Sequence, residues 1–230
     1  MSITQAIGSA AGYVLRGLVR FLTGIRVHPN VLTSIGLAIN IVAAWLFARG
    51  ELFSAGMVVL GAAVFDLVDG PVARSSNRVT RFGGFLDSVL DRYSDLILLM
   101  GLLVYYASIN RFFYIILTAV AMTGSVLVSY TRARSENVIG SCKVGFLERP
   151  ERIVLIIIGA LTNRMAPVVW VIAVLANFTV IHRIVHTWRE CQVLDRADEA
   201  RQEAGKSEEP AAEGERQASG DIGHRVHPAV

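Results

Sequence analysis

Apolar residues recur in six runs along the chain, separated by short polar breaks. The runs are Val31–Phe47, Leu52–Val68, Leu96–Ile109, Phe112–Tyr130, Ile153–Leu161 and Ala166–Ile181. A helix needs about 20 residues to cross a bilayer, and most runs reach that length once polar motif residues or flanks are included. The fifth run is short and is expected to start further back, near Glu151. The pattern predicts an all-α membrane protein with six transmembrane helices.

The segment before the first run has a different pattern. From Ile3 to Ile25, apolar and small residues alternate, and Arg16 and Arg20 are four residues apart. This arrangement is typical of an amphipathic helix lying in the membrane interface. A seventh span is the alternative, but both arginines would then face hydrocarbon. We therefore expect an interfacial helix over about residues 3–25, before the six spans.

Composition supports the membrane assignment and marks where it ends. The chain is 53% hydrophobic, with a mean hydropathy of +0.50, which is too apolar for an ordinary soluble domain. After Arg189 the composition shifts to Glu, Ala, Gly, Ser and Arg. We therefore predict a membrane domain over residues 1–188 and a polar, disordered cytoplasmic tail over 189–230. Within the tail, one further helical turn is expected near Val193–Arg201.

The basic residues of the loops predict the orientation. With six spans, only Arg49, Arg111 and Arg164 fall on one side of the membrane, and the other basic loop residues fall on the opposite side. The positive-inside rule then places both termini and the larger polar loops in the cytoplasm. We expect a multi-pass protein of the cell (inner) membrane, with the lipid bilayer as a partner and no nucleic-acid partner.

All five aspartates of the first 190 residues lie within one stretch of thirty: Asp66, Asp69, Asp87, Asp91 and Asp95. A carboxylate at the bilayer midplane costs about 2.5–3.5 kcal/mol. Spacings of i, i+3 and i, i+4 put each pair on one helix face, which suits hard divalent cations. Salt bridges to arginine are set aside because no basic residue lies within helical reach of the first pair. An ion-conducting membrane protein stays an alternative from another functional class.

Eight positions form a motif that links the second and third runs. It reads Asp66-x2-Asp69-Gly70-x2-Ala73-Arg74-x8-Gly83-x3-Asp87-x3-Asp91. In this motif the chain resembles the CDP-alcohol phosphatidyltransferase family, and the resemblance extends to about Trp188. It implies an enzyme that moves a phosphatidyl group from a CDP-lipid (CDP-diacylglycerol) to an alcohol and releases CMP. It also implies a homodimer with a cytoplasmic active site.

The resemblance implies a role for each motif residue. Asp66, Asp69, Asp87 and Asp91 would hold two Mg²⁺ ions, with Mn²⁺ as an alternative, and Asp91 would be the catalytic base. Asp95 lies outside the motif, and a structural partner is the preferred role for it. The implied CDP-lipid contacts are Pro29, Asn30, Val31, Leu32, Gly70, Ala73, Arg74, Thr80 and Gly83. Thr80 and the Pro29 segment have a second interpretation, since such residues also cap helices.

A second polar region concerns the acceptor alcohol. It reads Ser129-Tyr-Thr-Arg-Ala-Arg134 and then Gly145-Phe-Leu-Glu-Arg-Pro-Glu-Arg152. Several arginines in these two segments suit an acceptor that carries its own phosphate, because guanidinium groups bind phosphate oxygens. The candidate ligands of that phosphate are Ser129, Arg132, Arg134, Arg149 and Arg152.

Both segments resemble those of prokaryotic phosphatidylinositol phosphate synthases and their archaeal relatives. The resemblance implies inositol 1-phosphate as the phosphorylated polyol acceptor. Position 132 departs from it, with Arg where those synthases have Lys. Glycerol 3-phosphate, as in a phosphatidylglycerophosphate synthase, remains an alternative. The lipid backbone, diacylglycerol or archaeol, is left open.

Overall fold

The computed structural model describes the backbone of residues 29–75 and 80–221, and the side chains of residues 30–66 and 80–203. These residues form six α-helices: α2 (Pro29–Ala48), α3 (Leu52–Ser75), α4 (Arg81–Ser108), α5 (Phe112–Ile139), α6 (Arg149–Leu161) and α7 (Met165–Asp221). The predicted all-α class is confirmed for this part of the chain. The expected interfacial helix lies outside the described residues.

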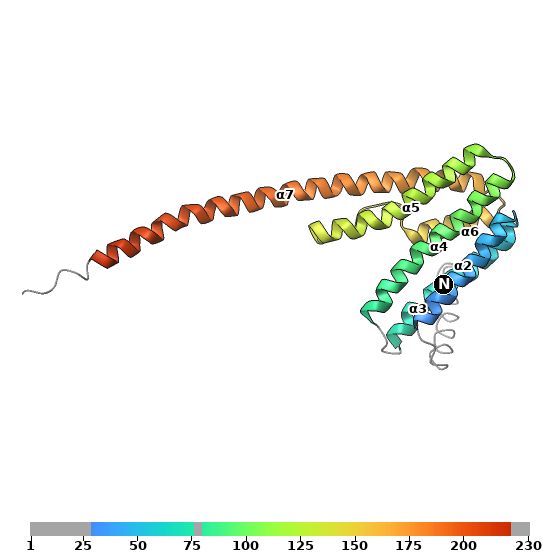
Figure 1. The fold of residues 1–230 in the computed structure, drawn as a ribbon, viewed down its shortest axis with the longest axis horizontal. Coiled ribbons are helices and arrows are strands. Elements are labelled where there is room, and N and C mark those ends of the chain that lie inside the picture. The colour runs from blue at the N-terminus through green and yellow to red at the C-terminus, as the bar shows by residue number, and fades with distance from the viewer. Residues whose placement is uncertain (1–28, 76–79, 222–230) are drawn as a thin grey trace, which may run out of the picture.

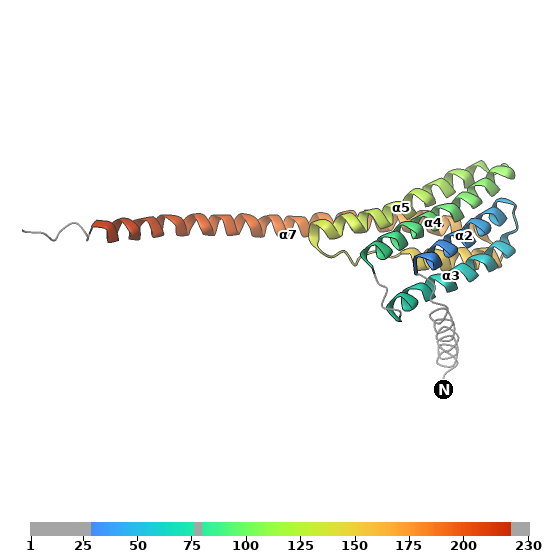
Figure 2. The ribbon, with the colours of Figure 1, turned by 60° about the horizontal axis from the view of Figure 1, so that its bottom comes forward.

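The six helices close into a ring. Packing runs from α2 to α3, from α3 to α6, from α6 to α7, from α7 to α5, from α5 to α4, and from α4 back to α2. Figures 1 and 2 show the helices running side by side, with α7 continuing far beyond the others. Each helix buries one stripe against two neighbours, and the ring interior holds a continuous apolar core around Phe47, Leu98, Leu102 and Ile172.

The outside of the ring is also apolar. Large exposed side chains include Trp45, Phe53, Phe113, Ile116 and Trp170. A helix that is apolar all round is typical of a membrane span. Three helices in the described part are long and apolar enough to cross a membrane: Asn30–Ala48, Phe112–Ile139 and the first part of Met165–Glu203. Helix α6 has 13 residues, about 20 Å of helix, which is shorter than the roughly 30 Å hydrocarbon core.

The two ends of the ring differ in charge and loop length. One end carries the tight turns around Gly50, Asn110 and Asn163, all of which have positive φ. Arg49, Arg111 and Arg164 also lie in these turns. The other end gathers the start of α2, α4 and α6, the end of α3 and α5, and the loop at residues 140–148. All candidate site residues therefore belong to this second end.

Helix α7 is longer than the sequence analysis expected. We predicted a disordered tail after residue 188 with one further turn of helix, but the helix continues to Asp221. From Trp188 to Glu203 the side chains are almost all exposed, so packing does not hold this part. Its Glu, Ala, Arg and Gln residues have high intrinsic helix propensity, and they extend a helix that the ring has already nucleated.

Candidate active site

The start of α4 lies beside the start of α2. Thr80 caps α4, because its hydroxyl accepts a hydrogen bond from the Gly83 amide at 2.9 Å. A Cβ added at Gly83 would lie 3.1 Å from Asn30 Oδ1, so these predicted contacts of the CDP-lipid are neighbours. Val31 is 49% exposed, whereas Leu32 is 2% exposed and belongs to the interior. A Leu32 side-chain contact with the nucleotide is therefore not supported.

Acidic side chains from α3 and α4 face each other across the ring interior. Asp66 Oδ2 lies 2.7 Å from one terminal nitrogen of Arg149, and Asp91 Oδ1 lies 3.1 Å from the other. Asp87 is close enough for its charge to interact with those of Asp66 and Arg149. Gly36 of α2 provides the room, since a Cβ there would lie 3.0 Å from Asp66 Oδ1. The packing of the ring thus brings Asp66 of α3 close to Asp91 of α4 through their shared contact with Arg149.

The side chains of five predicted site residues lie outside the described part of the structure. The backbone of Pro29 belongs to α2, and that of Asp69, Gly70, Ala73 and Arg74 belongs to α3. They therefore stay predictions.

The expectation that Asp66 has no basic partner is wrong. It considered only residues within reach along the same helix. Arg149 comes from α6, 83 residues away in sequence, and its guanidinium lies between Asp66 and Asp91. A contact of this kind depends on how α3, α4 and α6 pack in the ring, which helical spacing cannot give.

Arg152 serves a different purpose from the predicted one. We expected it to bind the acceptor phosphate, but its side chain is 2% exposed and donates to Asp95 Oδ2 at 2.5 Å and to the Leu147 carbonyl at 3.3 Å. Asp95 is itself buried, and its other oxygen lies 3.6 Å from Arg149. The preference for a structural partner at Asp95 is confirmed. The pair fixes α4 to the start of α6.

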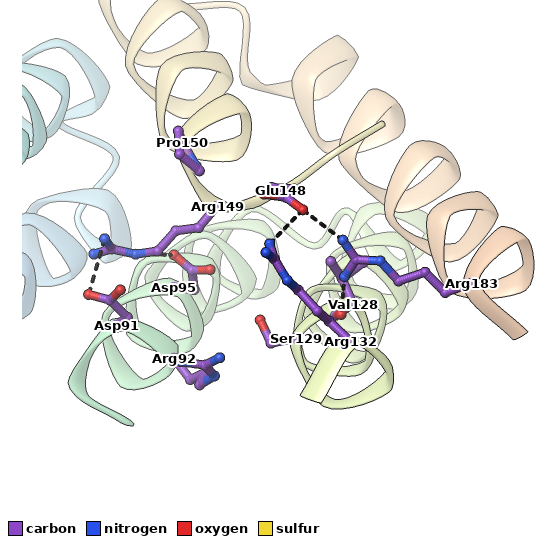
Figure 3. A pocket seen from close by; sticks show the side chains of 10 residues that line it. All are labelled: Asp91, Arg92, Asp95, Val128, Ser129, Arg132, Glu148, Arg149, Pro150 and Arg183. Atoms are coloured by element: carbon purple, nitrogen blue, oxygen red, sulfur yellow. Dashed lines mark hydrogen bonds and ion pairs between the residues drawn. The ribbon is translucent and has the colours of Figure 1, made fainter. Parts of the chain in front are cut away.

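Beside the carboxylates, a cavity of about 150 Å³ opens between α4, α5, α6 and α7 (Figure 3). Its lining residues are Asp91, Arg92, Asp95, Val128, Ser129, Arg132, Glu148, Arg149, Pro150 and Arg183. Three of the five predicted acceptor ligands, Ser129, Arg132 and Arg149, are in this lining. Arg134 is not, and it points to the exposed side of α5.

Glu148 organises the far wall of the cavity. Its Oε1 accepts from Arg132 at 2.9 Å and from Arg183 at 2.8 Å, as Figure 3 shows. Arg132 is also paired with Glu136 at 3.0 Å. Arg183 is 1% exposed and is anchored by the carbonyls of Val144, at 2.8 Å, and Val128, at 2.5 Å. The guanidinium of Arg183 is therefore held in one orientation.

Sequence reasoning missed Arg183, Arg92 and Glu148 as cavity residues. Arg183 was considered only for its charge in the membrane orientation. A usable signal was present, because Thr179, Arg183 and Thr187 recur every four residues in an apolar run. Such a stripe lies on one helix face. In the structure Thr179 accepts from the backbone amides of residues 146 and 147, and Thr187 pairs with Ser135 at 2.7 Å.

The carboxylates provide the chemistry that a divalent cation needs. Asp66 and Asp91 bring oxygen atoms from two helices to one positively charged group, which shows that this position accommodates a cation. Hard carboxylate oxygens are the ligands that Mg²⁺ and Mn²⁺ prefer. Among the side chains that the structure describes, no three form a preassembled metal-binding cluster. Asp66 and Asp91 therefore fit a divalent cation in their negative charge and their oxygen donors.

An apolar helical ring with acidic and basic side chains gathered at one end is typical of a membrane protein with a site for charged ligands. The family model described as CDP-alcohol phosphatidyltransferase matches residues 26–187. The chain belongs to this family, and it is an integral membrane phosphatidyltransferase.

Individual relatives and solved structures are similar to this chain over more than two thirds of its length. The archaetidylinositol phosphate synthase of Pyrococcus horikoshii is 37% identical over 164 residues, covering 71% of this chain and 85% of the relative. The crystal structure of Mycobacterium tuberculosis phosphatidylinositol phosphate synthase with CDP-DAG bound has a TM-score of 0.70 at 30% identity, covering 76% of this chain and 94% of that one. The same protein in complex with manganese and citrate gives a TM-score of 0.69 at 30% identity, covering 76% and 88%.

Proposed function

We propose that this enzyme transfers the phosphatidyl group of a CDP-lipid, CDP-diacylglycerol or its archaeol counterpart, to inositol 1-phosphate and releases CMP. The observation that carries the proposal is the cavity in which Arg132, Arg149 and Arg183 lie beside Asp91. Guanidinium groups bind phosphate oxygens in a bidentate manner. An acceptor with its own phosphate would therefore be held with its hydroxyl toward the carboxylates. The names of the relatives support the same acceptor.

In this proposal Asp66, Asp69, Asp87 and Asp91 hold divalent cations, Mg²⁺ or Mn²⁺, two of them as the family resemblance implies. Bound there, the ions would neutralise the pyrophosphate of the CDP-lipid. The M. tuberculosis structure with manganese supports a divalent metal. The start of α2 and the Thr80–Gly83 turn lie together at the same end of the ring, which supports the predicted nucleotide contacts there.

The reaction needs one proton transfer and no covalent enzyme intermediate. Asp91 accepts the proton of the acceptor hydroxyl as its oxygen attacks the phosphorus that bears the lipid. The bond from that phosphorus to the CMP oxygen breaks, and CMP leaves with the electron pair. Asp91 suits this role because it lines the cavity next to the arginines. Arg183 and Arg132 orient the acceptor phosphate, with Arg183 taking the place that we predicted for Arg152.

Six membrane spans, a homodimer, and an active site and termini in the cytoplasm belong to the same proposal. The ring of six helices and the placement of Arg49, Arg111 and Arg164 at the far end support the topology. The family resemblance supports the dimer. Glycerol 3-phosphate is the second candidate acceptor, since it also carries a phosphate. Membership of a transferase family argues against the ion-conducting alternative.

An acceptor panel tests the function. Purified full-length protein is incubated with CDP-diacylglycerol, Mg²⁺ or Mn²⁺, and inositol 1-phosphate, glycerol 3-phosphate, serine or free inositol, and CMP release is measured. We expect turnover with inositol 1-phosphate at a rate well above the other acceptors. Turnover with serine or free inositol alone would contradict the proposal, because neither brings a phosphate for the arginines.

A further inference from the structure

Arg149 contacts more carboxylates than any other described side chain. Its guanidinium lies 2.7 Å from Asp66, 3.1 Å from Asp91 and 3.6 Å from Asp95. Asp95 has a second basic partner, Arg152, at 2.5 Å. Among the described residues, Arg149 is the one basic side chain that pairs with Asp66 and Asp91. These two carboxylates therefore depend on Arg149 for their charge compensation.

The position of Arg149 conflicts with two roles in the proposed function. These are metal binding by Asp66 and Asp91, and phosphate binding by Arg149 itself. A divalent ion held by Asp66 and Asp91 needs the oxygen atoms that Arg149 now contacts, and two cations at that distance repel. A guanidinium bound to two carboxylates is also not free to bind a phosphate. Both conflicts disappear if the side chain leaves the carboxylates when a metal ion arrives.

The charges in the cavity indicate how a released Arg149 would help to bind the acceptor phosphate. Arg132 and Arg183 already share Glu148, and Arg92 donates to the carbonyl of Ser88 in its own helix. A phosphate monoester brings a charge of about −1.5 to −2. Among the described lining residues, Arg92 is the one arginine without a salt bridge to a carboxylate, and its single charge does not balance the phosphate. A released Arg149 would supply the additional positive charge.

Resting on the proposed function, we propose that Arg149 is a positioning residue that exchanges partners between the metal ligands and the acceptor phosphate. Without metal, its guanidinium holds Asp66 and Asp91 together. When the carboxylates bind divalent ions, the guanidinium turns into the cavity and binds the acceptor phosphate. Arg149 is the first residue of α6 and precedes Pro150, whose ring restrains the backbone. The long side chain can therefore move while the helix stays in place. Metal binding then precedes acceptor binding.

Mn²⁺ binding tests the exchange without any turnover. Free Mn²⁺ is measured by electron paramagnetic resonance on purified full-length protein, with neither CDP-lipid nor acceptor present. Arg149→Gln removes the competing cation, so we expect Mn²⁺ to bind at least about fivefold more tightly than to the wild type. Arg132→Gln is the matched control, because it removes the same charge from the same cavity, and its carboxylate partners are Glu136 and Glu148 rather than the aspartates. Its Mn²⁺ affinity should change by less than about twofold.

Unchanged or weaker Mn²⁺ binding by Arg149→Gln would overturn the proposal. An equal gain in Arg132→Gln would also overturn it, since the lost positive charge alone would then explain the tighter Mn²⁺ binding. A second measurement uses the wild type and does not depend on how the variants fold. Phenylglyoxal, which modifies arginine, should label the Arg149 peptide faster with Mn²⁺ present and slower again when inositol 1-phosphate is added. A labelling rate that Mn²⁺ does not change would contradict the exchange. These readouts are independent of the acceptor panel, so the two proposals fail separately.

Discussion

At the scale of single residues, Asp91 meets two requirements of the proposed base, which are access to the cavity and closeness to the other carboxylates. It is 24% exposed, lines the cavity, and lies within 3.1 Å of Arg149. It can therefore reach both the acceptor and the other carboxylates. Its neighbour Asp95, one helical turn further along α4, is only 8% exposed and has Arg152 as a buried partner. Two aspartates on one helix face thus differ in role because burial differs over a single turn.

Asp91→Asn should lower the rate of CMP release by about 10²–10⁴, because the amide cannot accept the proton of the acceptor hydroxyl. Asparagine keeps the shape of the side chain, so the variant should still fold and bind CDP-lipid. CMP release and CDP-lipid binding, measured on the same preparation, check both expectations. Activity close to that of the wild type would rule out the assignment of Asp91 as the base.

Asp95→Asn should destabilise the protein, because it leaves the guanidinium of Arg152 buried without a full counter-charge. Breaking a buried ion pair by removing one partner costs about 3–5 kcal/mol. Glu51→Gln is the control, since its pair with Arg49 is exposed and worth about 0–1 kcal/mol. Thermal unfolding in detergent measures both. Equal midpoints for the two variants would show that the buried pair does not stabilise the fold.

At the scale of helices, close approach depends on a few small residues. Gly101 of α4 faces the backbone of Ala44 in α2, and an added Cβ would lie 2.8 Å from Ala44 Cα and 2.9 Å from its carbonyl carbon, with the carbonyl oxygen also in the way. Backbone atoms cannot move aside as a side chain does. The α2–α4 contact in the ring therefore requires glycine at this position.

Gly101→Ala should lower the free energy of unfolding by about 1–3 kcal/mol, the usual cost of overpacking. Gly61→Ala is the matched control, because a Cβ there meets nothing within 4 Å. Alanine favours a helix over glycine by about 1 kcal/mol, so the control should be neutral or slightly more stable. Thermal unfolding of both variants measures this difference in stability. A Gly101→Ala protein as stable as the control would mean that α2 and α4 do not approach this closely.

At the scale of the whole molecule, the closed ring gives the protein two unlike ends. One end has three short turns with single arginines, and the other carries the ion-pair network and the cavity. The distribution of positive charge favours a cytoplasmic location for the second end.

Cysteine labelling tests this orientation. In a background without Cys142 and Cys191, Ser108→Cys places a thiol at the far end and Ser141→Cys places one at the end with the cavity; both serines are exposed. A membrane-impermeant maleimide added to intact cells should label Ser108→Cys only. After the membrane is opened, it should label both. Labelling of Ser141→Cys alone in intact cells would reverse the proposed topology.

The local patterns that carried the sequence analysis are those whose partners are near in sequence. Apolar runs indicated the helices, and the i, i+3 and i, i+4 spacing of the aspartates indicated a shared face, because helical periodicity relates residues a few positions apart. The same periodicity could not show that Arg149 meets Asp66 or that Arg152 is buried on Asp95. These contacts join α6 to α3 and α4 over more than fifty residues.

The sequence by itself determined the all-helical fold and the acidic helix faces on which the proposed chemistry depends, since both follow from composition or short-range spacing. Its motif also carried the resemblance to the family. Only the tertiary structure decided which arginines face the cavity. It buried Arg152, turned Arg134 outward, and brought Arg183 and Arg92 into the lining. The physical reason is that ring closure sets how each helix is rotated about its axis. That rotation results from packing against two neighbours at once.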